Sequence, residues 1–371
     1  MAATYTYLAV DLRTNVILNE LPLHGVTFDR QVNKAGNFGG SSNLDNDRLS
    51  NDDLLTATEP GRTGMYIYRD DKIVWGGILW SRTYQSQSKS VELSGQTWES
   101  YAYRRIYRGA QVTLNQPQCN IIQTLWTDLQ WADPRGNINV LGASSFPTSD
   151  IVRSIQYNPY DFKSYGTSID DICDNFDDSP EFTIDSFEDG AGNLVKQLVF
   201  GYPRIGNIVD LTNLIIDYPG NILNYYYTEN ASSGNNRFWA TGDGDESSVI
   251  YGVAEDTDNI NSGWPILEGT ASHSGVTVQA TIDSHAQADL ASSPMPVITH
   301  SFELKADVEP IFGTYALGDD AKVQIQDARF PNGLDTSVRV VGWSVTPPES
   351  DNTESVSLTL QEDVNTGSVS V

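Results

Sequence analysis

The densest strand signal in the chain is Met65-Tyr66-Ile67-Tyr68, followed after a short gap by Ile73-Val74-Trp75-Gly76-Gly77-Ile78-Leu79-Trp80-Ser81-Arg82. Both runs are rich in aromatic and β-branched residues, which favour strands, and Arg69-Asp70-Asp71-Lys72 between them has the polar composition of a turn. The pattern predicts a β-hairpin. Gly76 and Gly77 in the middle of the second arm indicate a bulge or a sharp bend, as at the corner of a small barrel.

The residues on both sides of this hairpin also read as strands. Residues 4–12 and 89–95 alternate between apolar and polar side chains, and residues 21–28 form an apolar run. We therefore expect residues 1–110 to form a first β-barrel domain.

After residue 110 the periodicity changes to that of helices. One predicted helix begins at Pro117 and ends before Asp133-Pro134, with apolar residues at helical spacing: Ile121, Ile122, Leu125 and Leu129. A second helix is expected to be capped by Ser168, with Asp171 three residues later. Strands at 181–187 and 194–201 complete the pattern, so residues 111–210 are expected to form an α+β domain.

The remainder of the chain, residues 211–371, reads as β again. It predicts a second β-barrel domain with a small insertion at about 252–297 that contains one helix, residues 281–291. The fold class expected is thus mainly β with α+β parts: two tube-forming barrels, an intervening α+β domain and a small helical insertion.

Short matches relate the two β regions. Gly64-x-Tyr66 before Asp70-Asp71 has the spacing of Gly313-x-Tyr315 before Asp319-Asp320. Trp80-Ser81 likewise matches Trp343-Ser344, and residues 90–93 match residues 355–358. Three matches in the same order favour a duplicated β unit over chance. Three chains with two similar barrels each would place six similar barrels around one axis. A trimer could therefore dock on a hexameric ring.

The charge of the chain excludes some functions. The 371 residues include 22 Lys and Arg against 49 Asp and Glu, which gives a formal charge of −27 and disfavours specific binding to DNA or RNA. Residues 1–110 are balanced, with 12 basic and 12 acidic residues, so the whole excess follows them. With 8 Trp, 18 Tyr and 12 Phe, the chain is too aromatic to be disordered.

The sequence contains none of the common catalytic or metal-binding motifs. The four histidines (His24, His273, His285 and His300) fit no metal or catalytic motif, and the acidic runs lack the spacing of a calcium loop. Cys119 and Cys173 read as buried apolar residues. The sequence also has no export signal and no run long enough to cross a membrane. We expect no enzymatic activity, no cofactor, no metal site and no stable membrane insertion.

Positive charge concentrates in one place, residues 101–108. Aromatic residues alternate there with arginines: Tyr101, Tyr103, Arg104, Arg105 and Arg108. Such a composition suits stacking on nucleic acid or a protein interface, and the acidity of the rest of the chain favours the interface.

Several segments resemble a known family. Residues 70–82, followed by Leu93-Ser94-Gly95-Gln96-Thr97-Trp98-Glu99-Ser100-Tyr101, resemble minor tail proteins of long-tailed actinobacterial phages, which form the tail-tip or baseplate hub. Later segments look like further landmarks of that family: residues 218–222, 285–288 and 340–347. The resemblance covers nearly the whole chain.

The resemblance implies a structural virion protein, made in the host cytoplasm and located at the tail tip. Such hubs are homotrimers that join the six-fold tail tube, through a distal tail ring protein, to a three-fold tip. The implied partners are the tape measure protein and further tail-tip or adhesin proteins, with genomic DNA passing only in transit. Many relatives carry a C-terminal hydrolase or binding extension, whereas this sequence stops soon after Leu360.

Two further expectations stand beside that of a tail-tip hub. A carbohydrate-binding or cell-wall-polysaccharide-degrading β protein is the alternative, since exposed Trp and Tyr side chains stack on sugar rings. Within a hub, we expect the acidic excess after residue 110 to lie partly on the wall of the DNA channel, where carboxylates repel phosphate. Arg104, Arg105 and Arg108 would then face a protein neighbour.

Overall fold

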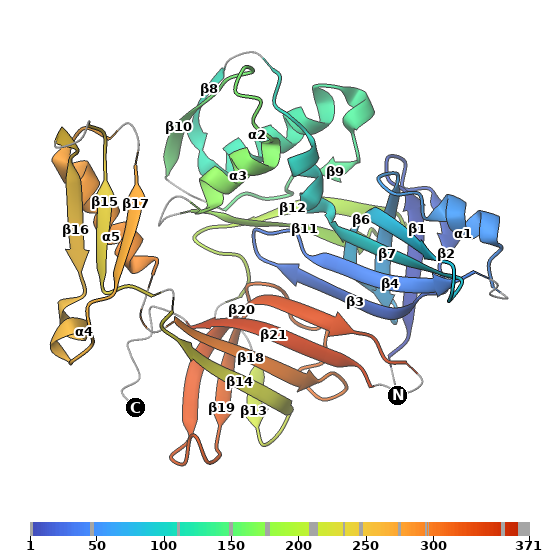
Figure 1. Cartoon of the computed structure of the whole chain (residues 1–371). Helices are drawn as coiled ribbons and strands as arrows, with labels where there is room; N and C mark the ends of the chain where they lie inside the picture. Colours follow the sequence, from blue (N-terminus) through green and yellow to red (C-terminus); the bar gives the residue numbers. More distant parts are fainter. Residues whose placement is uncertain are drawn as a thin grey trace. The chain divides into compact units, whose positions relative to one another are not determined.

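The computed structural model describes residues 3–44, 48–109, 112–147, 151–174, 179–207, 214–232, 234–244, 248–273, 276–293, 295, 297–349 and 353–362 (Figure 1). The contacts divide the chain into two compact units. The main unit comprises Met1–Asn224 with Phe302–Val371, and the small unit comprises Tyr225–Ser301.

A sheet of thirteen strands dominates the main unit. Its N-terminal strands are β1 (Tyr5–Asp11), β2 (Ile17–Glu20), β3 (His24–Gln31), β4 (Asn37–Asn43), β5 (Thr63–Arg69), β6 (Lys72–Gln85) and β7 (Ser90–Thr97), with helix α1 (Asn51–Ala57) between β4 and β5 in sequence. Its C-terminal strands are β13 (Ile215–Tyr218), β14 (Ile222–Asn230), β18 (Val297–Lys305), β19 (Asp320–Ile325), β20 (Leu334–Thr346) and β21 (Ser355–Glu362). The predicted hairpin is confirmed as β5 and β6, which pair antiparallel.

Strand β20 joins the two halves of this sheet. The order is β14-β18-β21-β20-β3-β4-β7-β6-β5-β1-β2, with β19 on β20 and β13 on β19. Residues 334–339 of β20 pair with β19, and residues 342–345 of the same strand pair with residues 28–31 of β3. One long strand therefore connects residues that are more than 300 positions apart in the chain.

The strands of the described residues form no closed barrel, because this ladder is open at β2, β13 and β14. The mainly β class is confirmed, whereas the expected pair of tube-forming barrels is not. Alternation along a sequence predicts that a segment is a strand and which face it buries, but it does not predict its neighbour. The sequence therefore gave no sign that β20 would pair with β3.

The interpretation of Gly76 and Gly77 as a bulge is wrong in its details. Both glycines of β6 keep the register with β5, since they pair with Tyr66 and Met65, and the register shift lies beside Val74 instead. A Cβ atom on Gly76 would lie 2.3 Å from Oγ of Ser186. This glycine allows another strand to approach closely.

The middle of the main unit is α+β, as expected. Its elements are 3₁₀ helices η1 (Trp98–Arg104) and η2 (Pro134–Gly136), helices α2 (Gln118–Trp131) and α3 (Tyr165–Asp174), and strands β8 (Val112–Pro117), β9 (Val140–Leu141), β10 (Val152–Tyr157), β11 (Glu181–Glu188) and β12 (Leu194–Gly201). The predicted apolar stripe of α2 is fully buried in a core shared with Trp98 of η1 and with Tyr66 and Ile78 of the N-terminal strands. Burial of this shared surface fixes the middle segment against the sheet.

Helix α3 begins four residues earlier than a cap at Ser168 predicts. The hydroxyl of Ser164 accepts a hydrogen bond from the Thr167 amide at 3.0 Å, so Ser164 caps the helix. Ser168 lies inside the helix, and its hydroxyl donates to the Ser164 carbonyl at 3.0 Å. Both serines have polar neighbours at suitable spacing, which is why the pattern selected the wrong one.

The small unit is a three-stranded sheet with a helix on one face. Its strands lie in the order β16 (Tyr251–Glu255), β15 (Arg237–Thr241), β17 (Glu268–Ser272), and α4 (Thr257–Asn261) follows β16 in sequence. Helix α5 (Gln279–Ala291) confirms the helix predicted at 281–291 and packs on β15 and β16. The core between them is small and consists of Ala240, Ala254, Ile282 and Ala286.

The internal matches correspond only in part to equivalent structure. Trp80 and Trp343 both lie in long strands, β6 and β20, which form antiparallel hairpins with β7 and β21. The registers differ, because Leu93 pairs with Arg82 whereas Leu358 pairs with Trp343. The first match fails, since Gly64 lies within β5 but Gly313 lies in a loop before β19.

Candidate functional site

The tyrosines of the predicted interface segment are tied to the middle of the main unit. Tyr101 and Tyr103 lie in η1, directly after β7. The Tyr101 hydroxyl donates to the Gly136 carbonyl at 3.0 Å, and the Tyr103 hydroxyl donates to Oδ1 of Asp170 at 2.8 Å. Both side chains thus help to attach η1 to η2 and α3.

The three arginines of this segment have different surroundings. Arg104 lies 5.8 Å from the ring centre of Trp80, and Arg108 lies 4.4 Å from that of Phe162, so each makes a cation–π contact. Both remain exposed. Arg105 is half-buried, and it packs so closely on Gly136 that a Cβ atom there would overlap the guanidinium. The side chains of Arg104 and Arg108 are therefore exposed, whereas that of Arg105 is half-buried.

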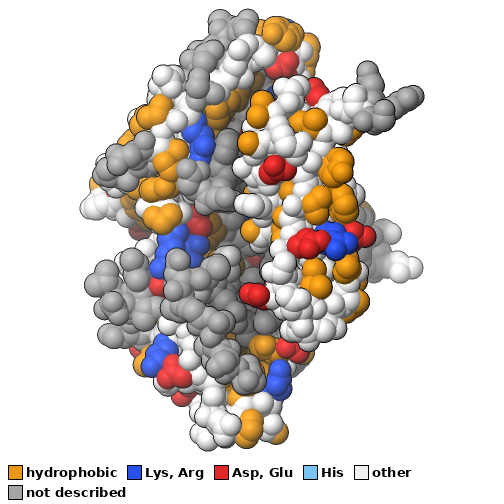
Figure 2. Space-filling view, turned by 90° about the vertical axis from the view of Figure 1, so that its left-hand side faces the viewer, with side chains coloured by type: hydrophobic (Ala, Val, Ile, Leu, Met, Phe, Trp, Pro, Cys, Tyr) orange, Lys and Arg blue, Asp and Glu red, His pale blue; other side chains and the backbone are white. Residues whose placement is uncertain are grey.

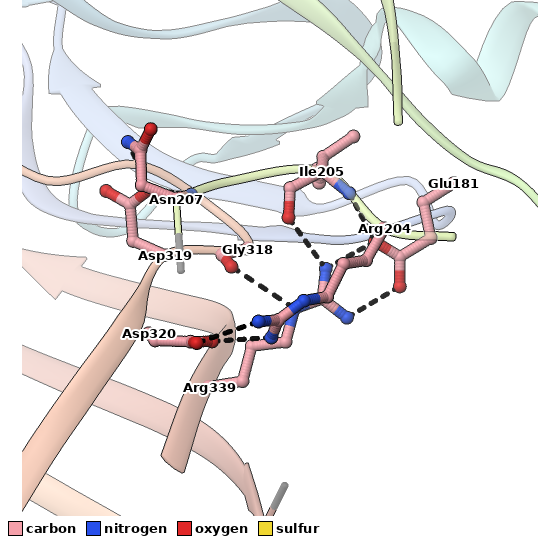
Figure 3. Close-up of polar contacts among 8 residues, drawn as sticks. All are labelled: Glu181, Arg204, Ile205, Asn207, Gly318, Asp319, Asp320 and Arg339. Atoms are coloured by element: carbon pink, nitrogen blue, oxygen red, sulfur yellow. Dashed lines mark hydrogen bonds and ion pairs between the residues drawn. The ribbon is translucent and has the colours of Figure 1, made fainter. Parts of the chain in front are cut away.

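A buried polar cluster that the sequence did not indicate lies elsewhere in the main unit. It joins the start of β11, the segment after β12, the start of β19 and the middle of β20 (Figure 3). We call it the junction cluster, and its charged members are Glu181, Arg204, Asp319, Asp320 and Arg339.

Arg339 of β20 is at the centre of the junction cluster, and its side chain is 9% exposed. Its guanidinium makes a two-pronged ion pair with the carboxylate of Glu181, with one N–O distance of 2.6 Å. The same group donates to the carbonyls of Gly318 and Ile205, each at 3.2 Å. Arginine is suited to this position because its fixed fork of donors satisfies several acceptors at once.

The acidic members of the junction cluster hold the segment after β12. Arg204 pairs with both oxygens of Asp320, at 2.5 and 2.7 Å. Asp319 accepts hydrogen bonds from the backbone amide and the side-chain amide of Asn207, at 2.8 and 2.9 Å. Asp319 and Asp320 are 6% and 1% exposed, so their charges are stabilised by these partners rather than by water.

A second buried ion pair joins the end of β5 to the residue before β21. Arg69 of β5 and Glu354, just before β21, have side chains that are 10% and 8% exposed. Their atoms meet at 2.7 and 2.8 Å, and Glu354 also accepts the Tyr5 hydroxyl at 2.5 Å. Burial, followed by this hydrogen bond, raises the pKa of Tyr5 far above its usual value, so its hydroxyl stays protonated and remains a donor.

A cavity of about 340 Å³ lies beside the junction cluster, between β6, β11 and the loop before β19. Its walls mix charged and aromatic side chains, among them Arg30, Lys72, Asp185, Phe312 and Trp343. Arg30 is engaged with Asp185 at 2.9 Å and with the Thr183 hydroxyl at 2.7 Å. The ion pair between Arg30 and Asp185 on this wall joins β3 to β11.

The histidines expected to lack a catalytic role have structural neighbours where the structure describes them. His24 contacts the Ser41 hydroxyl at 3.0 Å, and His273 pairs with Asp289 at 2.8 Å while its ring stacks on that of His285. Among the described residues, no group of three or more His, Cys, Asp or Glu side chains is placed to hold a metal ion. No helix of the described residues is long and apolar enough to span a membrane.

Comparison with known proteins relates this fold to solved structures. No family model and no curated protein matches the sequence. A tail protein from Neisseria meningitidis MC58 superposes with a TM-score of 0.59 at 13% identity, over 97% of both chains. The chain has the fold of phage tail proteins. The 43 kDa tail protein of prophage MuSo2 from Shewanella oneidensis agrees, with a TM-score of 0.58 at 10% identity over 96% of this chain and 98% of the other.

A third tail protein, gp18 of a Listeria monocytogenes prophage, has a TM-score of 0.51 at 13% identity, over 95% of this chain and 94% of its own. Each of these tail proteins is matched from end to end, so the tail-protein fold includes both units of this chain. At such identities the similarity concerns the fold alone. The fold supports the tail-protein part of the resemblance seen in the sequence.

Proposed function

We propose that this chain is a structural protein of a phage virion, the homotrimeric hub of the tail tip or baseplate. The observation that carries the proposal is the tail-protein fold, which is matched over nearly the full length of three tail proteins. The hub would join the six-fold tail tube, through a distal tail ring protein, to a three-fold tip. The sequence resemblance to actinobacterial minor tail proteins supports this position in the tail.

The proposed division into residues 1–110, 111–210 and 211–371 is retained within this function. The buried ion pairs Arg339–Glu181 and Arg69–Glu354 link these three parts within one protomer. A part of the ejection channel needs walls that keep their shape while DNA passes. Paired buried charges supply such rigidity, because separating them leaves an uncompensated charge.

An open strand edge offers a surface for assembly. Among the described residues, strand β2 pairs with β1 alone. Val16 just before it, and Ile17 and Leu18 within it, are 60%, 58% and 36% exposed. Leu55 of the neighbouring helix α1 is also exposed. An exposed apolar edge strand readily accepts a further strand. We propose that a neighbouring chain of the trimer covers this edge.

Charge supports two further parts of the proposal. The acidic excess after residue 110 would lie partly on the channel wall and repel DNA in transit. Arg104 and Arg108, which stay exposed beside Trp80 and Phe162, would face a protein neighbour such as the distal tail ring. The tape measure protein and adhesins are the other partners proposed.

Native mass spectrometry of the full chain tests the trimer, whose mass would be three times 40.8 kDa. Labelling of purified virions with an antibody against the chain tests its place at the tail tip. A strictly monomeric protein that is absent from virions overturns the proposal.

A further inference from the structure

The small unit has a sheet face that its own helix leaves uncovered. Side chains alternate across a strand, so Phe238 and Ala240 of β15 point toward α5 while Arg237, Trp239 and Thr241 point away. The register places the neighbours of this second set beside it: Tyr251, Val253 and Glu255 of β16 and Glu268, Thr270 and Ser272 of β17. We call these nine residues the outer face.

Aromatic rings form the apolar part of the outer face. Tyr251 is 57% exposed and Val253 is 39% exposed, and both belong to β16, an edge strand of the three-stranded sheet. The ring centres of Trp239 and Tyr251 are 5.8 Å apart with an angle of 47° between the planes. Figure 2 shows hydrophobic side chains exposed on one face of the molecule around paired basic and acidic ones. The two rings thus offer an apolar surface on a rigid support.

Polar groups on the same face are held in fixed positions. Nε of Arg237 donates to Glu255 at 2.6 Å, and its Nη1 lies 3.5 Å from Glu268. Glu268 also accepts the indole N–H of Trp239 at 2.8 Å, which fixes the ring. This hydrogen bond lowers the pKa of Glu268 from its usual value, so the carboxylate stays an acceptor at neutral pH.

The composition of the outer face favours one class of ligand. Protein interfaces are depleted in Glu and Ser at their centres, whereas here two glutamates, a serine and two threonines surround the rings. The formal charge of the face is −1 from Arg237, Glu255 and Glu268, which disfavours nucleic acid and anionic polymers. A neutral saccharide presents both an apolar ring face and many hydroxyls, and it matches aromatic rings flanked by hydrogen-bonding groups.

We infer that the outer face of the small unit binds a neutral saccharide. The sugar ring stacks on Tyr251 and Trp239, and its hydroxyls exchange hydrogen bonds with Arg237, Glu255 and Glu268. The site needs only the residues of the small unit. The inference therefore does not rest on the proposed trimer or on the proposed place in the tail.

Affinity electrophoresis and calorimetry of the full chain test this inference. The probes are hydroxyethyl cellulose, galactomannan and soluble starch in the gel, and hexasaccharides of glucose and N-acetylglucosamine in the calorimeter. Polygalacturonate serves as the anionic comparison. At least one neutral probe is expected to retard the chain, and polygalacturonate is not.

Variants locate the site. Tyr251→Ala and Trp239→Ala are each expected to weaken binding about tenfold. Tyr160→Ala removes a tyrosine in the main unit that is 65% exposed, and it should bind like the parent chain. Because Trp239 is partly buried, its variant is checked for an unchanged far-ultraviolet circular dichroism spectrum, while Tyr251 is exposed enough to be replaced without that concern. No retardation by any neutral probe, or equal binding by both variants, overturns the inference.

Discussion

Gly206 and Gly318 lie against each other where the segment after β12 crosses the segment before β19. A Cβ atom on Gly206 would lie 2.0 Å from the carbonyl carbon of Gly318, and one on Gly318 would lie 2.2 Å from the carbonyl oxygen of Ile205. Both glycines also have positive φ angles, of 90° and 89°. This crossing brings Asn207 and Arg204 within reach of Asp319 and Asp320, so the junction cluster depends on backbones that only glycine allows.

Replacement of Gly318 by Ala is therefore expected to destabilise the main unit strongly. The left-handed backbone alone costs about 1–2 kcal/mol for a residue with a Cβ atom, and the contact with Ile205 adds to it. Gly333→Ala is the matched control, since its φ is 83° but its nearest atom would be 4.0 Å away. Urea unfolding should show a loss at least twice as large for Gly318→Ala, and equal losses would contradict the role of the crossing.

Removal of Arg339 is expected to cost about 3–5 kcal/mol of unfolding free energy, because Glu181 is left as an unpaired buried charge. The variant Arg339→Met keeps most of the side-chain volume and isolates the charge effect. The double variant Glu181→Gln with Arg339→Met should recover part of the loss, because it removes the orphaned charge. Denaturant titrations of the single and double variants measure this coupling, and strictly additive losses would contradict it.

Lys196 leads to a prediction about pH. Its side chain is fully buried, its ammonium donates to the carbonyls of Ile138 and Leu12 at 2.7 and 3.1 Å, and desolvation lowers its pKa to about 7. The unfolded chain keeps this proton up to a pKa of about 10.4, so between these values it binds more protons than the folded chain. Stability from this group should therefore rise as the pH increases from 7 to about 10.

The variant Lys196→Met removes this proton and should remove the rise, which is about 1.4 kcal/mol per pH unit at most. Lys34→Met, at an exposed position, should keep the slope of the parent chain. Unfolding free energies at several pH values measure the difference. Parallel curves for the parent chain and Lys196→Met would show that the folded chain retains the proton.

The sequence predicted what depends on neighbours in the chain. Helix α2 was recognised because Ile121, Ile122 and Leu125 recur at helical spacing, and the β5–β6 hairpin because both arms and the turn between them are contiguous. The junction cluster was missed because Arg339 and Glu181 are 158 residues apart, and neither lies in a pattern that marks it. The pairing of β20 with β3 was missed for the same reason.

The predicted interface segment, residues 101–108, shows what amino-acid composition cannot distinguish. The alternation of tyrosine and arginine in residues 101–108 predicts a protein interface. The tyrosine contacts, to Gly136 and Asp170, lie within the chain itself. Composition alone does not distinguish a side chain that attaches its own helix from one that meets a partner, since both use the same hydrogen bonds and cation–π contacts.

A last prediction concerns the exposed edge at β2. If a neighbouring chain covers this edge, then Ile17→Lys places a charge in an apolar contact and should weaken trimer formation by at least tenfold in concentration. Ile17 is 58% exposed, so the folded protomer should keep its melting temperature at low protein concentration. Glu20→Lys, on the same strand, is the control for a change of charge.

Sedimentation velocity over a range of protein concentrations separates the two effects. The expected result is a shift from trimer to monomer for Ile17→Lys and a smaller shift or none for Glu20→Lys. Trimers of unchanged strength in the Ile17 variant would mean that this edge stays open in the assembly. In that case the surface that joins the protomers would have to be sought at Arg104 and Arg108, whose joint replacement by Ala leaves the Arg105 packing on Gly136 intact.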